Sequence, residues 1–114
     1  MLEKQPFPFE FQLIYLRLKD ETNFPAGYCW EASIRVESWG YRRVRGYFRL
    51  DTPIAEDGAL FEPHGWNLDD QGRIIDMTAS QFNDGLNHES QIPEGVLIIE
   101  EDDPLYNRYR LKKE

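Results

Sequence analysis

Three residues of types that support nucleophilic catalysis stand far apart in the sequence: Cys29, His64 and Asp76. A histidine whose ring is held by a carboxylate can act as a general base toward a cysteine thiol. Asp76 lies in the apolar stretch RIIDM, where burying an unpaired carboxylate would be costly, so it needs a partner such as His64. These residues therefore form a candidate Cys–His–Asp triad.

The cysteine requires an element that activates it. Residues 29–39 place apolar and small side chains at helical spacing and are followed by Gly40, which predicts a short helix that begins at Cys29. A thiolate at a helix N-terminus is stabilised by the free backbone N–H groups and by the helix dipole. Gly27 would allow a tight turn into this helix.

The histidine and the aspartate lie on a predicted hairpin, in which residues 60–68 and 73–77 flank the turn sequence DDQG. A three-residue turn around Asp70 would place His64 and Asp76 directly opposite each other, and a turn shifted toward Gly72 would make them diagonal neighbours. A two- or four-residue turn would send them to opposite faces. The sequence alone does not select the register.

The remaining segments complete a single α+β domain over residues 1–114, in which the helix carrying Cys29 packs on a small antiparallel sheet. Strands are predicted over residues 41–50 and 96–101. Residues 10–20 fit helical and strand spacing equally well. We expect mostly loop over residues 78–95 and a short amphipathic tail over residues 102–114.

The charge balance excludes several partners. The chain has 13 basic and 21 acidic residues and a net charge of −8, which argues against nucleic acid and anionic membranes. Arg42, Arg43, Arg45 and Arg49 are a local exception, of a kind that is more often a solvated strand face than a phosphate site. No signal peptide or membrane span is expected, and a single cysteine, which allows no intrachain disulfide, is typical of a reducing, cytoplasmic location.

Each candidate residue also has an ordinary structural interpretation. A single cysteine is usually a small buried apolar residue, and Asp76 could simply cap the following turn with Thr78. His88 lies in a polar loop and is expected to be solvated. The three triad residues could also bind zinc, but the sequence has no closely spaced ligand pair, so we expect no metal and no cofactor.

The stretches AGYCWEAS and HGWNLDDQGRIIDMTASQF resemble small bacterial proteins of the transglutaminase-like and papain-like cysteine-peptidase superfamily. That pattern has a G-x-C at a helix start with a small residue three positions on, then His-x-Trp, a turn with glycine, and a hydrophobic-Asp-x-Thr strand. The matching residues are Gly27, Cys29, Ala32, His64, Trp66, Gly72, Ile75, Asp76 and Thr78, and the run to Phe82 is similar to the tail of the motif. The resemblance spans about residues 23–83.

The resemblance implies that Cys29 is the nucleophile, His64 the general base and acid, and Asp76 the residue that orients the imidazole. Asn23 is the candidate side chain for stabilising an oxyanion, although it could equally be an ordinary loop asparagine. Trp30 and Trp66, which flank the triad residues, are candidates for substrate binding.

Two functions follow from this sequence. The first is acyl transfer from a peptide, amide or thioester substrate through a Cys29 thioester. The second is a non-catalytic module of the same fold that binds a protein partner, since aromatic residues, which often anchor interfaces, cluster near Cys29. These aromatic residues are Tyr28, Trp30, Trp39, Tyr41 and Tyr47. The sequence leaves the oligomeric state open.

Overall fold

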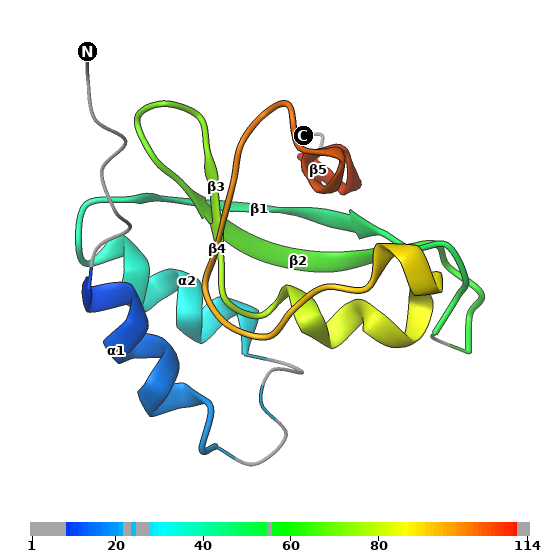
Figure 1. Ribbon diagram of the computed structural model, residues 1–114, viewed down its shortest axis with the longest axis horizontal. Helices are drawn as coiled ribbons and strands as arrows, with labels where there is room; N and C mark the ends of the chain where they lie inside the picture. The colour runs from blue at the N-terminus through cyan, green and yellow to red at the C-terminus, as the bar shows by residue number, and fades with distance from the viewer. Residues whose placement is uncertain (1–8, 22–23, 25–27, 55, 112–114) are drawn as a thin grey trace.

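A computed structural model describes residues 9–21, 24, 28–54 and 56–111 of the chain. They form a small α+β domain built on a five-stranded sheet of order β4-β3-β2-β1-β5, with every neighbouring pair antiparallel (Figure 1). The strands are β1 (Arg42–Arg49), β2 (Phe61–Leu68), β3 (Ile74–Asp76), β4 (Leu97–Ile99) and β5 (Tyr109–Leu111). The helices are α1 (Phe9–Leu18) and α2 (Cys29–Glu37), with 3₁₀ helices η1 (Ala79–Gly85), η2 (His88–Ser90) and η3 (Pro104–Arg108).

The sheet separates two hydrophobic clusters. Helices α1 and α2 cover one face, here called the helical face, and lie side by side in Figure 1. Their buried residues pack against Ile75 and Met77, from β3 and just after it. The opposite face is covered by η1 and the segments that follow it, which pack against Phe48, Trp66 and Tyr109. Because successive side chains of a strand point to opposite faces, a two-sided sheet needs apolar residues at both parities.

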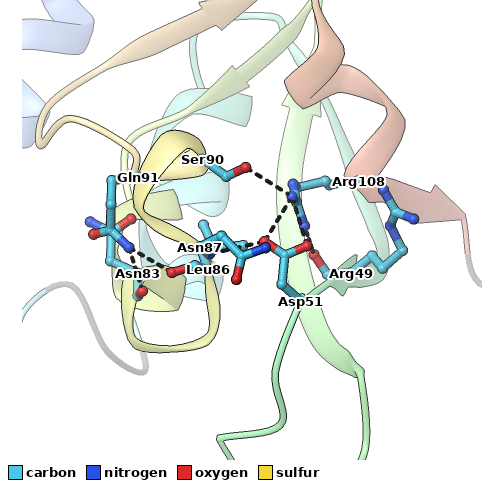
Figure 2. A network of polar contacts seen from close by, with 8 residues as sticks. All are labelled: Arg49, Asp51, Asn83, Leu86, Asn87, Ser90, Gln91 and Arg108. Carbon is cyan, nitrogen blue, oxygen red and sulfur yellow. Dashed lines mark hydrogen bonds and ion pairs between the residues drawn. The ribbon is translucent and has the colours of Figure 1, made fainter.

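A buried arginine ties the C-terminal segment to the rest of the domain (Figure 2). Arg108, only 9 % exposed, donates to the Arg49 carbonyl, to both carboxylate oxygens of Asp51 and to the Ser90 hydroxyl. Asp51 also accepts from the backbone N–H of Asn87. The segment that carries β5 is therefore joined by charge-assisted hydrogen bonds to the end of β1 and to the turn around η2.

The expected α+β class and the main elements are confirmed. The predicted helix at Cys29 is α2, the strand over residues 41–50 is β1, and the ambiguous N-terminal segment is the helix α1. Two expectations were incomplete: residues 78–95 include the 3₁₀ helices η1 and η2, and the predicted tail contributes η3 and β5. Among the described residues, no helix is both long enough and apolar enough to cross a bilayer.

Candidate active site

The register of the β2–β3 hairpin determines that His64 and Asp76 share a face. Asn67 pairs with Ile75 and Leu68 with Ile74, which makes His64 and Asp76 diagonal neighbours across the ladder. The loop between the strands is closed by a hydrogen bond from the Asp69 N–H to the Arg73 carbonyl. This is the register in which the turn is shifted toward Gly72, where φ is +78°.

His64 and Asp76 form a buried pair. The imidazole Nε2 lies 2.6 Å from Asp76 Oδ2, and the two residues are 2 % and 3 % exposed. Burial lowers the pKa of His64, but the charge and the hydrogen bond of Asp76, aided by Cys29, outweigh it and bring the pKa to about 9. Burial raises the pKa of Asp76, and its contacts with His64, Tyr109 and Thr78 more than reverse that effect. Each partner therefore favours the charged form of the other.

Asp76 has two further partners that fix its orientation. Its Oδ1 accepts from the Thr78 backbone N–H at 2.9 Å and from the Thr78 hydroxyl at 3.1 Å. Its Oδ2 also accepts from the Tyr109 hydroxyl at 2.7 Å. Burial and the Asp76 charge raise the pKa of Tyr109 well above its usual value, so this hydroxyl remains a donor. Asp76 thus caps the turn at Thr78 and holds His64 at the same time.

Aromatic rings hold the imidazole in place on the face opposite the helices. The His64 ring lies edge-to-face against Phe82, with 4.9 Å between centroids, and tilted against Trp66 at 5.8 Å and Tyr109 at 5.9 Å. Phe48 also packs edge-on against it. Four aromatic neighbours and one carboxylate leave the ring little freedom to rotate.

Cys29 approaches His64 from the other layer of the fold. It is the first residue of α2, which packs on β2, and it is half-buried. Since Nε2 is bonded to Asp76, Nδ1 is the ring nitrogen left for the thiol; it is buried and has no hydrogen-bond partner of normal geometry among the described residues. The Cys29–His64 contact is therefore looser than the 2.6 Å His64–Asp76 bond.

The surroundings of Cys29 favour its thiolate. Burial raises the pKa of the Cys29 thiol, but the proximity and charge of His64 and the backbone N–H of Gly65 together lower it below its usual value. Because the histidine pKa is raised while the cysteine pKa is lowered, proton transfer from thiol to imidazole is favoured. The arrangement supports a thiolate–imidazolium pair.

A small cavity adjoins the thiol between α2 and the sheet. Its volume is about 10 Å³, close to the minimum for one water molecule. Cys29, Ser33, Gly65, Asn67 and Asp76 contribute to its lining.

The other candidate residues have different positions. Trp30 is half-buried beside Cys29, and its ring lies against Gly65, where an added Cβ would be 3.3 Å from two ring carbons. Trp66 is 3 % exposed within the hydrophobic core, so it supports His64 rather than offering a surface to a substrate. His88 is exposed, as expected. Asn23 and Gly27 lie outside the described residues.

Two residues of the site were not predicted from the sequence. Tyr109 is 33 positions from Asp76 along the chain and reaches it only because β5 pairs with β1. Gly65 sits between His64 and Trp66, and a glycine inside a strand is a signal for close approach of another group. Within the part of the chain that the structure describes, no group of three or more His, Cys, Asp or Glu residues is arranged to hold a metal ion.

Comparison of the chain with protein-family models, with curated proteins and with solved structures gives no match. The chemistry must therefore be argued from the site itself. Its components are a half-buried thiol at a helix N-terminus, a buried imidazole beside it and a carboxylate that fixes the imidazole.

Proposed function

We propose that this protein is a cysteine-dependent acyl-transfer enzyme that acts on a peptide, amide or thioester. The observation that carries the proposal is the orientation of His64: Nε2 is bonded to Asp76 while buried Nδ1 is left for the Cys29 thiol. A nucleophile, a base and a residue that orients the base are the parts that such chemistry requires. We also propose that the α2–β2–β3 unit corresponds to the core of transglutaminase-like and papain-like cysteine peptidases.

The proposed reaction has two stages. The Cys29 thiolate attacks the substrate carbonyl carbon, which forms an S–C bond and an oxyanion. The intermediate collapses, the bond to the leaving group breaks, and His64 gives its proton to the departing amine or thiol. Water or an amine then attacks the thioester while His64 takes a proton, and the S–C bond breaks to leave the Cys29 thiolate beside the protonated imidazole. Asp76 keeps the imidazole oriented and stabilises its charged form throughout.

Backbone N–H groups can stabilise the oxyanion. The N–H of Cys29 is one of the first four of α2, which have no acceptor within the helix. The N–H of Gly65 already interacts with the Cys29 sulfur and lies at the same end of the site. Two such donors beside the nucleophile form the usual arrangement for tetrahedral intermediates.

The test is the capture of an acyl-enzyme. The protein would be treated with p-nitrophenyl acetate and digested, and acetylation of each peptide would be quantified by mass spectrometry. We expect rapid acetylation of Cys29 that is abolished in Cys29→Ser and strongly slowed in His64→Gln. His88→Gln is the matched control, because His88 is exposed and outside the hydrogen-bond network of the site, and it should react as the wild type does.

The result also separates the proposal from its alternative. If Cys29 is acetylated no faster than a cysteine in the unfolded chain, and His64→Gln has no effect, the enzyme proposal is wrong. The non-catalytic module that binds a protein partner would then be the better account of the same fold.

A further inference from the structure

A cationic surface lies next to Cys29 on the helical face. Arg43 and Arg45 of β1 extend from this face, and both guanidinium groups lie over the ring of Trp30, the residue after Cys29. The guanidinium carbons are 5.2 Å and 4.2 Å from the ring centroid. Two positive charges are thus held beside one aromatic ring. They repel each other, and a bound anion would offset this repulsion.

This surface is connected directly to the site. Arg45 pairs with Gly65 across the β1–β2 ladder, and the Gly65 N–H interacts with the Cys29 sulfur. Trp30 packs on Gly65 from the helix side. The Arg45 guanidinium is therefore positioned by the same glycine and the same helix turn that position the nucleophile.

The two cations are poorly neutralised within the protein. Arg43 Nε lies 4.0 Å from Glu37 Oε2, a long and exposed ion pair of little energetic value. Among the described residues, Arg45 has no ion pair or hydrogen bond, although the chain contains 21 acidic residues. Within the part of the chain that the structure describes, the Arg45 charge is therefore available for a ligand.

The pattern continues along the strand. Arg43, Arg45, Tyr47 and Arg49 alternate onto one face of β1, and Arg110 of β5 pairs with Tyr47. All four arginines are exposed. Alternate residues of a strand are about 7 Å apart, which is also the repeat of side chains on one side of an extended peptide. Carboxylates at alternate positions of such a peptide would match the arginines.

We infer that the substrate is an acidic, extended polypeptide segment whose carboxylates pair with Arg45 and Arg43 while its acyl carbon lies at Cys29. The inference rests on the proposed function and names its substrate class. A nucleic acid would offer similar charge but no acyl carbon to a cysteine nucleophile. Since the chain has a net charge of −8, it repels acidic polypeptides elsewhere, and this surface would determine where one binds.

The first experiment measures the local selectivity of Cys29. Alkylation rates with anionic iodoacetate and neutral iodoacetamide are compared. Because both reagents react with the same thiolate, the ratio of the iodoacetate rate to the iodoacetamide rate does not depend on the pKa of the Cys29 thiol. We expect Arg45→Gln to lower the iodoacetate-to-iodoacetamide ratio by about threefold to tenfold, and salt to lower the wild-type ratio. Arg42→Gln is the matched control: it removes the same charge three positions earlier on β1, where the side chain points to the other face of the strand, and should leave the ratio unchanged. An identical ratio in wild type and Arg45→Gln would overturn the inference.

The second experiment does not depend on catalysis. Binding of an oligoglutamate peptide to the Cys29→Ser variant is measured by calorimetry, with Arg45→Gln and Arg42→Gln introduced into that background. We expect salt-dependent binding that Arg45→Gln weakens and Arg42→Gln retains. No binding, or equally tight binding of a single-stranded oligonucleotide, would refute the acidic-peptide assignment. Failure of acyl-enzyme capture with selective peptide binding would instead reject the enzyme proposal, and the acidic polypeptide would then be a binding partner and not a substrate.

Discussion

Replacing Asp76 by asparagine tests the energetic role of the buried pair. Asp76 is 3 % exposed, and its carboxylate accepts from His64, Tyr109 and twice from Thr78. Asparagine keeps the size but removes the charge, and its NH₂ group cannot accept a hydrogen bond. The amide oxygen can serve Thr78, whose N–H can only donate, so the NH₂ group must face His64 and Tyr109.

Two charge-assisted hydrogen bonds are lost in this variant. Hydrogen bonds to a charged group contribute about 1.5–3 kcal/mol each, and part is recovered because a neutral imidazole and a phenol can accept from the amide. We therefore expect Asp76→Asn to lower the free energy of unfolding by about 3 kcal/mol, a large part of the 5–15 kcal/mol typical of small domains.

Urea unfolding at neutral pH measures this loss as a shift of the midpoint at constant slope. Asp70→Asn, in the exposed turn of the same hairpin, makes the same charge change and should stay within about 0.5 kcal/mol of wild type. An Asp76→Asn protein as stable as Asp70→Asn would refute the argument that Asp76 is stabilised by its buried partners.

Two further substitutions probe how β5 supports the site. Tyr109→Phe removes a hydrogen bond to the Asp76 carboxylate and should destabilise the protein by about 2 kcal/mol in urea unfolding, whereas Tyr106→Phe, which loses a bond to a neutral carbonyl, should cost about 1 kcal/mol; equal losses would contradict the role given to the Asp76 charge. Gly46→Ala should displace β5, because the added Cβ would overlap the Arg110 carbonyl oxygen and come within 2.6 Å of Trp66. We expect this substitution to lower the urea midpoint of unfolding by more than Tyr109→Phe does. A Gly46→Ala protein as stable as wild type would show that β5 is not held as described.

The sequence predicts the parts of the site that depend on local patterns. The helix at Cys29 follows from apolar spacing and from Gly40, whose φ of +97° suits glycine. The hairpin follows from its turn residues, but its register depends on how the loop from Asp69 to Arg73 closes, which involves both the backbone and the Asp69 side chain. Turn composition alone does not determine that closure.

The parts of the fold and of the site that the sequence does not predict depend on contacts between distant segments. β4 and β5 have three residues each, too few for a period to be recognised, and they exist because β3 and β1 offer edges to pair with. Tyr109 therefore gave no sequence signal as part of the site. The η1 helix was predicted as loop because a 3₁₀ turn lacks the 3.6-residue period, although Phe82 within it stacks on Phe48 at 4.4 Å.

The central claim is that Cys29 and His64 form a coupled thiolate–imidazolium pair. It is tested most directly by the pH dependence of Cys29 alkylation by iodoacetamide. The Cys29 pKa is lowered and that of His64 is raised to about 9, so the thiolate forms below the usual thiol pKa of about 8.5 and is paired with imidazolium until the pH rises through about 9. We predict a rate that begins to rise at a lower pH than the rate of an ordinary thiol and changes again near pH 9.

In His64→Gln the low-pH rise should disappear and leave one transition near or above pH 8.5, while His88→Gln should retain the wild-type profile. A wild-type profile with a single ordinary thiol transition, the same in His64→Gln, would contradict the account.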